Sequence, residues 1–248
     1  MIKNYTSNFQ EVNIYKKTSK KSEIISQMIY GDSFKILKKK KKWLKIKVKE
    51  DGYVGFVLNK KYSEYVKPTH KVAVLSANIY KKPKLKNSVG KITFGSKITI
   101  EKISTKFSKF KKNKWIENKN LKPIKFKNKN IFLNIGIFKN VKYKWGGKTF
   151  NGLDCSALIQ NFMNFNNEFC PRDTEDQVRY FKKNVKLKNV KKNDILYWKG
   201  HVAVALSNKE LIHAYGPMKK TVIMSIAEAI KVIKKTANLD LKSIKRIK

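Results

Sequence analysis

The stretch NGLDCSALIQ, residues 151–160, decides the architecture of the second half of the chain. Within it, Asp154 follows a glycine turn and stands where the N-cap residue of a helix is expected. From Cys155 to Met163, apolar residues recur at the i, i+3, i+4, i+7 and i+8 spacing of an amphipathic helix. Cys155 therefore opens a helix, where unpaired N–H groups and the helix dipole favour a thiolate. This position predicts a nucleophilic cysteine; the alternative is a small buried apolar residue, as most lone cysteines are.

Two of the three histidines fall in a predicted hairpin further along the chain. Residues 202–206 and 210–214 read as two strands around a turn near Ser207. With the turn centred there, His201 and His213 lie directly opposite each other on one face, with Cβ atoms about 4.5–5.5 Å apart. One imidazole then acts on the thiol while the other hydrogen-bonds its far nitrogen, as in catalytic triads. The alternative is two unrelated surface or core histidines.

Other chemistries that use these residue types have less support. Cys155, His201 and His213 could supply three zinc ligands. The sequence has neither a glutamate placed as in zinc deaminases nor a paired-cysteine motif, so we expect no metal. Gly146-Gly147 alone does not make a phosphate-binding loop. We therefore expect the chemistry to need no cofactor.

The formal net charge of the 248-residue chain is +41, and it comes almost entirely from lysine. The lysines are spread along the chain, whereas dedicated nucleic-acid readers cluster their basic residues and use arginine. We therefore favour a proteome-wide lysine bias over a surface selected to bind polyanions, and expect no specific nucleic-acid partner. Non-specific binding to nucleic acid or anionic membrane at low salt is expected in either case.

Composition also bears on the compartment. A hydrophobic content of 41% with 12% aromatic residues is enough for folded cores. Residues 1–10 contain no apolar run and no small-residue cleavage site, so we expect no secretory signal, and no segment has the length needed to span a bilayer. Two cysteines suit a reducing compartment, and the prediction is a cytoplasmic protein.

An internal repeat marks the first half of the chain. The sequence NIYKK at 13–17 recurs at 78–82, and each copy leads to a glycine turn, at Gly31 and Gly95, and then to a strand that begins near a tryptophan. Short alternating runs between turns rich in Gly, Asn and Lys predict small all-β barrels.

This half resembles two tandem bacterial SH3-like domains, over residues 1–66 and, in more divergent form, 67–125. The second copy lacks the closing strand GYVGFV that the first has at 52–57.

The character of the sequence changes at about residue 126. Four residues at helical spacing predict a helix before Tyr143: Ile131, Phe132, Ile135 and Phe138. After the Cys155 helix, four apolar stretches predict strands, at 195–198, 202–206, 210–214 and 221–224. Helices followed by strands predict an α+β domain over 126–248.

The stretch YKWGGKTFNGLDCSALIQ, residues 143–160, resembles the signature of the NlpC-type cysteine peptidases, a papain-like clan that acts on bacterial cell-wall peptides. Three further groups of residues agree with that family: 171–174 with Gln177, 193–198, and 200–202 with 212–214. The similarity covers nearly all of residues 127–248 and implies a papain-like catalytic domain with N-terminal helices and an antiparallel sheet. Ala157 stands where the family usually has glycine, and Val141-Lys142 replace the more usual proline. Neither departure removes a chemical group.

The resemblance implies a role for each of the three candidate catalytic residues. Cys155 is the nucleophile, His201 the base and acid, and His213 the orienting third member, and the mechanism starts from a thiolate–imidazolium pair. Tyr143 lies near the oxyanion, with its hydroxyl as a donor beside the Cys155 backbone N–H. The alternative for Tyr143 is aromatic packing.

Substrate contacts are also implied. Asp154 and Ser156 contact the free amino terminus and backbone of the substrate, and Arg172 and Asp173 pair with a carboxylate and an amine. The alternatives are that Asp154 is only a helix cap and that Arg172 and Asp173 form structural salt bridges. In this branch of the family an SH3-like domain adds an acid and an aromatic residue, for which Asp51 and Tyr53 are the candidates.

Together these features predict a cysteine peptidase that cleaves the γ-D-glutamyl-diaminopimelate bond of murein peptides. The expected substrate is a short peptide with a free N-terminal L-Ala-γ-D-Glu unit, recycled in the cytoplasm. One alternative is a wall-directed endopeptidase that acts on polymeric peptidoglycan. The other is a non-enzymatic basic module that binds polyanions.

Overall fold

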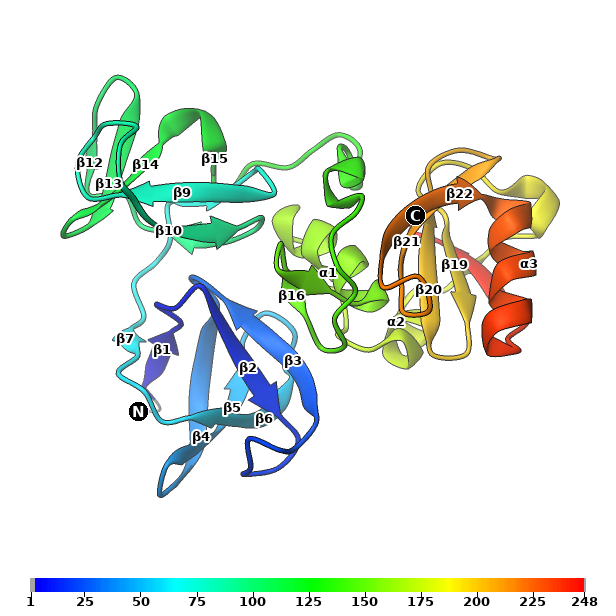
Figure 1. Cartoon of the computed structure of the whole chain (residues 1–248), viewed down its shortest axis with the longest axis horizontal. Helices are drawn as coiled ribbons and strands as arrows, with labels where there is room; N and C mark the ends of the chain where they lie inside the picture. Colours follow the sequence, from blue (N-terminus) through cyan, green and yellow to red (C-terminus); the bar gives the residue numbers. More distant parts are fainter. Residues whose placement is uncertain (1–2, 248) are drawn as a thin grey trace. The chain divides into compact units, whose positions relative to one another are not determined.

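The computed structural model describes residues 3–247, which form two compact units (Figure 1). The first unit contains the residues up to Phe126 together with Lys148–Phe150. The second contains Lys127–Gly147 and the chain from Asn151 onward. Each unit has its own core, and each is described separately below.

Antiparallel strands make up the first unit. A seven-stranded sheet has the order β3-β2-β6-β5-β4-β1-β7, and the next two sheets have the orders β10-β9-β14-β13-β12 and β11-β8-β15. A 3-10 helix at Asn118–Asn120 precedes β15. The strands are β1 (Asn4–Thr6), β2 (Glu11–Tyr15), β3 (Ile24–Ile29), β4 (Ser33–Lys40), β5 (Trp43–Val48), β6 (Val54–Leu58), β7 (Ser63–Glu64), β8 (His70–Val72), β9 (Ser76–Tyr80), β10 (Ser88–Thr93), β11 (Lys97–Ile98), β12 (Lys102–Ile103), β13 (Phe107–Lys111), β14 (Lys114–Glu117), β15 (Leu121–Pro123) and β16 (Lys148–Thr149).

The internal repeat has a structural counterpart. Asn13 donates to the Tyr15 hydroxyl (3.5 Å), and its counterpart Asn78 donates to the Tyr80 hydroxyl (3.3 Å). Both predicted glycine turns have left-handed backbones, with φ of +87° at Gly31 and +79° at Gly95. Two separate apolar clusters form the cores, one built on β2, β3, β4, β5 and β6 and the other mainly on β8, β9, β10, β13 and β14.

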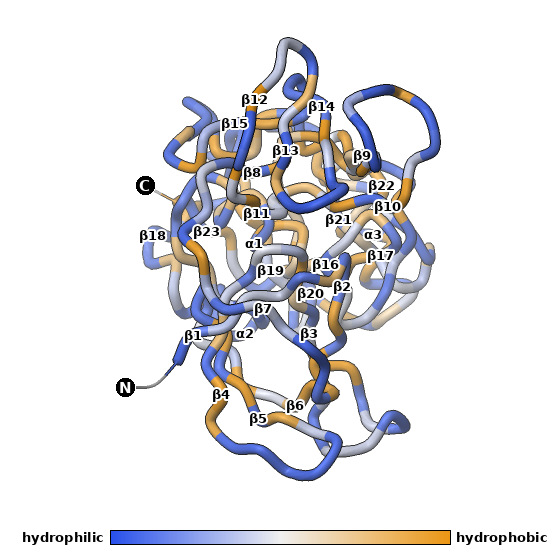
Figure 2. Tube along the Cα trace, turned by 90° about the vertical axis from the view of Figure 1, so that its left-hand side faces the viewer, coloured by the Kyte–Doolittle hydropathy of each residue, from blue (hydrophilic) through white to orange (hydrophobic). Residues whose placement is uncertain are grey.

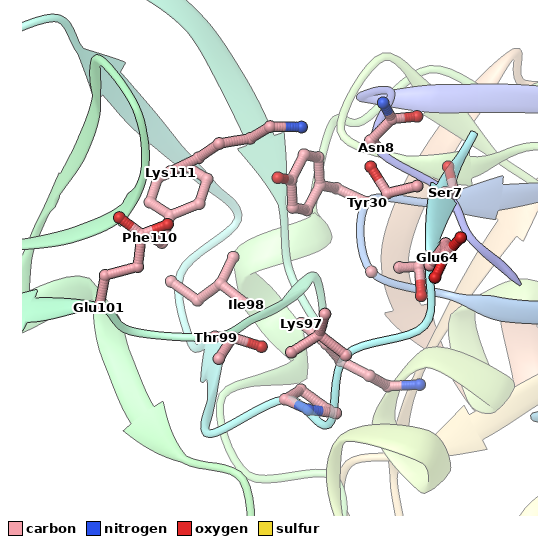
Figure 3. Close-up of a pocket in the computed structure, with 15 residues that line it drawn as sticks. Ser7, Asn8, Tyr30, Glu64, Lys97, Ile98, Thr99, Glu101, Phe110 and Lys111 are labelled. Atoms are coloured by element: carbon pink, nitrogen blue, oxygen red, sulfur yellow. The ribbon is translucent and has the colours of Figure 1, made fainter. Parts of the chain in front are cut away.

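A partly buried ion cluster joins the parts of the first unit that hold these two apolar clusters. The Lys97 ammonium lies 2.7 Å from a Glu50 carboxylate oxygen and 3.6 Å from one of Asp32. Only glycine fits at position 31, because a Cβ there would lie 2.1 Å from the Lys97 carbonyl oxygen. A cavity of about 300 Å³ lies beside this junction, with Tyr30 among the residues that line it (Figure 3).

The second unit is an α+β domain, as predicted. Its six-stranded antiparallel sheet has the order β18-β23-β19-β20-β21-β22, and α1 and α3 lie on opposite sides of it (Figure 1). Two 3-10 helices lie at Ile135–Phe138 and Leu187–Asn189. The other elements are β17 (Gly152–Leu153), α1 (Cys155–Phe165), α2 (Thr174–Tyr180), β18 (Lys183–Asn184), β19 (Ile195–Trp198), β20 (His201–Ala205), β21 (Glu210–Tyr215), β22 (Lys220–Ser225), α3 (Ile226–Ala237) and β23 (Ser243–Arg246).

The central strands are buried on both faces. Every residue of β19 and β20 is buried, which is the pattern of strands that are covered on both sides. On one face, Ala203 and Ala205 pack in a cluster with Ala229 and Ile233 of α3. The four predicted strands are all present, with ends that differ from the prediction by one residue at most.

The predicted helix over 131–138 is wrong. This segment forms turns and a single 3-10 helix, because Asn134 adopts a left-handed conformation (φ +62°) that interrupts an α-helix. Phe132, Ile135 and Phe138 are nevertheless buried, so the apolar spacing was a correct sign of burial. Within residues 3–247, no helix has the length and apolar character required to cross a membrane.

Candidate active site

Cys155 is the first residue of α1, and its predicted cap is present. The Asp154 side chain accepts a hydrogen bond from the Ala157 backbone N–H (2.9 Å), and the Asp154 backbone is extended. Cys155 is only 4% exposed. The cap therefore fixes the start of the helix, and with it the place of the sulfur.

The Gly146-Gly147 pair supports this cap. The Gly146 backbone N–H donates to the Asp154 carboxylate (2.9 Å), with the glycine in a left-handed conformation of φ +71°. A Cβ at position 147 would lie 2.4 Å from the Gly152 carbonyl oxygen. Both glycines are thus needed for the backbone to approach the helix start.

A buried ion pair holds the other side of Asp154. Arg172 donates two hydrogen bonds to the Asp154 carboxylate, at 3.1 and 2.6 Å, and a third to the Ser156 hydroxyl at 2.8 Å. Ser156 in turn donates to Asp154 at 3.2 Å. The structure thus contains the helix cap and the salt bridge that were the alternatives for Asp154 and Arg172. Contact of Asp154, Ser156 and Arg172 with a substrate remains a prediction.

Asp173 and Thr174 open the next helix. The Asp173 carbonyl accepts the backbone N–H groups of Asp176 and Gln177, which begins α2. The Thr174 hydroxyl lies 4.0 Å from the Cys155 sulfur. No role was predicted for Thr174, because its place beside the thiol comes from the packing of α2 and not from sequence spacing.

His201 and His213 are in direct contact. His201 Nε2 and His213 Nδ1 are 2.9 Å apart, and both side chains are buried. The prediction that they share a face is confirmed, but the predicted direct opposition is wrong. Val204 pairs with Ile212, so the hairpin is centred one residue beyond Ser207 and His213 lies diagonally across from His201.

The same register, continued to the start of β20, places Tyr215 opposite His201, a neighbour that was not predicted from the sequence. Its ring stacks on His213 at 5.0 Å with an interplanar angle of 12°, and lies 5.1 Å from the His201 ring. Its hydroxyl is 2.5 Å from the Thr236 hydroxyl on α3. Its spacing of two residues after His213, which places both on one face of the strand, was the signal that could have revealed it.

The hydrogen bond between the imidazoles determines which nitrogen of His201 is available for proton transfer. With Nε2 of His201 engaged by His213, Nδ1 is the nitrogen left to accept a proton. In that tautomer His201 Nε2 donates to His213 Nδ1, so His213 carries its own proton on Nε2. The backbone N–H of Val202, the next residue after His201, hydrogen-bonds to the Cys155 sulfur, which brings the helix start to the beginning of β20.

Burial makes the neutral forms of these groups the stable ones. It raises the pKa of the Cys155 thiol to about 11, and the Asp154 carboxylate adds to the rise. It also lowers the pKa of His201 well below the usual value, helped by His213, and lowers the pKa of His213 to about 4. Burial in the free site therefore favours the thiol and the neutral imidazoles, and the thiolate–imidazolium pair stays a prediction.

The pH dependence of Cys155 alkylation tests this. Because the thiol keeps its proton below a pKa of about 11, we expect the rate of reaction with iodoacetamide to rise steadily from neutral pH to about pH 10. The rate should be measured by mass spectrometry in a Cys170→Ala background, so that only Cys155 reacts. A plateau of reactivity already reached below neutral pH would instead establish a thiolate–imidazolium pair.

Tyr143 lies within electrostatic reach of the same thiol. Burial raises the pKa of its phenol, with further contributions from Cys155 and Asp154, so the hydroxyl remains a hydrogen-bond donor at neutral pH. Gly216 lies against its ring, where a Cβ would be 3.3 Å from Cε1. Within residues 3–247, no group of three or more His, Cys, Asp or Glu side chains is arranged to hold a metal ion.

The fold resembles that of known papain-like proteins. The structure is similar to a crystal structure of an NlpC/P60 family protein from Bacillus cereus, with a TM-score of 0.82 and 15% identity over 98% of this chain and 99% of that one. Residues 140–236 match the model of the NlpC/P60 family, and residues 14–61 match that of the bacterial dipeptidyl-peptidase Sh3 domain. The chain thus carries an NlpC/P60 domain that includes Cys155, His201 and His213, together with a bacterial SH3 domain over residues 14–61, which confirms the resemblance inferred for these two regions.

Curated relatives match shorter segments. Dipeptidyl-peptidase 6 of Lysinibacillus sphaericus is 33% identical over 72 residues, which are 29% of this chain and 27% of that protein. The γ-D-glutamyl-L-lysine dipeptidyl-peptidase of Bacillus subtilis is 29% identical over 102 residues, covering 38% of this chain and 34% of that protein. The matched segments thus span about a third or less of these relatives.

Proposed function

We propose that this chain is a cysteine peptidase that hydrolyses the γ-D-glutamyl bond to the diamino acid in peptidoglycan peptides. The observation that carries the proposal is the His201–His213 hydrogen bond, which lies within the NlpC/P60 match that also contains Cys155 at a capped helix start. The SH3 match and the names of the two dipeptidyl-peptidase relatives support the γ-D-glutamyl specificity.

The reaction begins from the neutral site. As the Cys155 sulfur attacks the γ-carbonyl carbon, its proton moves to His201 Nδ1, and the carbonyl becomes a tetrahedral oxyanion. Collapse of this intermediate breaks the C–N bond, and the same proton passes from His201 to the leaving amine. Water then attacks the acyl-enzyme thioester, giving its proton to His201, and the thiol leaves as the carboxylate is released.

Three groups are proposed to assist the reaction. His213 accepts a hydrogen bond from His201 and stabilises the imidazolium that forms transiently. The Tyr143 hydroxyl and the Cys155 backbone N–H are the proposed donors to the oxyanion, because Tyr143 keeps its proton and lies close to the thiol.

The proposed substrate is a short peptide with a free amino terminus. Asp154 and Ser156, which flank the nucleophile, are the proposed contacts for that terminus and the substrate backbone, and Arg172 and Asp173 are the proposed partners of a substrate carboxylate and amine. We also infer that residues 67–125 form a second SH3-like barrel, since they have an apolar cluster that is largely their own. A cytoplasmic role in peptide recycling is part of the proposal and can be tested by cell fractionation.

Mass spectrometry of L-Ala-γ-D-Glu-diaminopimelate incubated with the purified chain tests this function. We expect release of L-Ala-γ-D-Glu, with the N-acetylated peptide cleaved at least about tenfold more slowly because it cannot present an ammonium group. The same peptide with an L-Glu α-linkage is the stereochemical control and should remain intact.

Other outcomes would redirect the proposal. Equal cleavage of acetylated peptide or of polymeric peptidoglycan would indicate an endopeptidase that acts on the wall. If no γ-D-glutamyl peptide is cut, the peptidase function is contradicted.

A further inference from the structure

The β4–β5 hairpin concentrates the positive charge of the first unit. Its sequence, KILKKKKKWLKIKVK at residues 35–49, contains nine lysines and no acidic residue, and all nine lysines are exposed. Figure 2 shows the end of this hairpin as a continuous hydrophilic segment. The lysines of the whole chain are numerous, but the strand pairing gathers this set onto one hairpin.

The register places like charges against each other. Lys35 pairs directly with Lys47, and Lys38 with Lys45, an arrangement that destabilises a sheet by repulsion. The ion pairs of residues 3–247 involve other lysines, so no carboxylate neutralises these nine. Glu50, the acidic residue that follows the hairpin, forms an ion pair with Lys97. A locally unfavourable arrangement of this kind calls for a partner that supplies the missing negative charge.

We propose that this hairpin, residues 35–49, binds a linear phosphodiester polymer. The lysine ammonium is a point charge and lacks the planar guanidinium with which arginine forms paired hydrogen bonds to bases. The contact is therefore with the phosphates of the polymer backbone and does not depend on the base sequence. Alternate residues of a strand are about 6.6–6.8 Å apart, so Lys45 and Lys47 form a row that follows an extended polyanion.

The same hairpin is poorly suited to a membrane. Lys39–Lys42 form its tip, which offers only ammonium groups and no apolar side chain to enter the bilayer interface. Half-buried rings instead lie beside the lysine rows: Lys45 pairs with Phe56, and Trp43 packs edge-on against Tyr15 at 5.4 Å. Rings next to basic strands are typical of surfaces that bind single strands of nucleic acid.

The test compares two variants of equal net charge. The hairpin variant carries Lys→Gln at the two opposed pairs: Lys35, Lys38, Lys45 and Lys47. The matched control carries Lys→Gln at four exposed lysines of the second unit: Lys209, Lys231, Lys235 and Lys242. Fluorescence anisotropy should measure binding of labelled oligothymidylate, and competition by poly(glycerol phosphate), between about 50 and 200 mM salt.

We expect the hairpin variant to bind oligothymidylate at least about tenfold more weakly at low salt, with a shallower salt dependence, since each lost phosphate contact lowers the slope by about 0.7. The control should change by less than about twofold. Competition by poly(glycerol phosphate) at equal phosphate concentration would mean that the backbone alone is recognised. Weaker competition would mean that the bases also contribute by stacking.

Two results would overturn the proposal. Equal losses in the two variants would mean that binding follows net charge and that the hairpin has no special part. Absence of polymer binding together with hairpin-dependent binding to phosphatidylglycerol vesicles would assign the surface to a membrane. Because the substitutions relieve repulsion, the variant should keep its fold and peptide hydrolysis, so failure of the catalytic proposal is distinguishable from failure of this one.

Discussion

Replacing Cys155 by alanine is expected to reduce γ-D-glutamyl peptide hydrolysis by on the order of 10⁴-fold or more, because no other group can form the thioester. The variant should remain folded, since the substitution leaves the Asp154 cap and the backbone of α1 unchanged. Release of L-Ala-γ-D-Glu, followed by mass spectrometry, is the measurement, and circular dichroism is the check on folding.

Cys170 provides the matched control. It is the other cysteine of the chain and is fully buried, so Cys170→Ala removes a thiol of equal burial outside the histidine cluster. We expect its kcat/KM to remain within about threefold of the parent, even if the small cavity lowers stability by about 1 kcal/mol. Retained activity in Cys155→Ala, or an equal loss in both variants, would contradict the assignment of the nucleophile.

The shared face of His201 and His213 could be predicted from the sequence, whereas their exact pairing could not. Side chains alternate along a strand with a period of two, so His201 and His213 keep a shared face when the centre of the turn moves by a whole residue, as it does here. Direct opposition requires the exact turn centre, which is set by loop geometry: the Leu206 N–H bonds to the Glu210 carbonyl at 2.8 Å. The sequence therefore predicted the histidine contact but not Tyr215 as the direct neighbour of His201.

Local and non-local determinants separate in the same way around Cys155. The N-cap and the helix were predicted because capping involves residues three positions apart. The Arg172 partner lies 18 residues from Asp154, and only the folded chain brings the two together. The helix predicted before Tyr143 is wrong for a local reason. Its apolar spacing correctly indicated which residues are buried, but Asn134 adopts a left-handed conformation that the spacing does not reveal.

The Asp154–Arg172 pair makes the second large prediction. Both side chains are almost fully buried, with 6% and 1% exposure, so Arg172→Met leaves a carboxylate in the interior without its countercharge. We expect the free energy of unfolding to fall by about 3–5 kcal/mol, measured by urea denaturation. The exposed Arg179–Asp176 pair in the same unit is the control, and Arg179→Met should cost less than about 1 kcal/mol.

The double variant separates support of the fold from contact with substrate. Asp154→Asn keeps a good N-cap residue and removes the charge, so combining it with Arg172→Met should recover part of the lost stability. If the pair acts only through the fold, free and N-acetylated peptides should lose kcat/KM by the same factor. If Asp154→Asn raises KM selectively for the free-amine peptide, Asp154 also recognises the ammonium group of the substrate. A double variant less stable than the sum of the single effects would contradict the assignment of Asp154 and Arg172 as mutual partners, because each single change should already have removed their shared interaction.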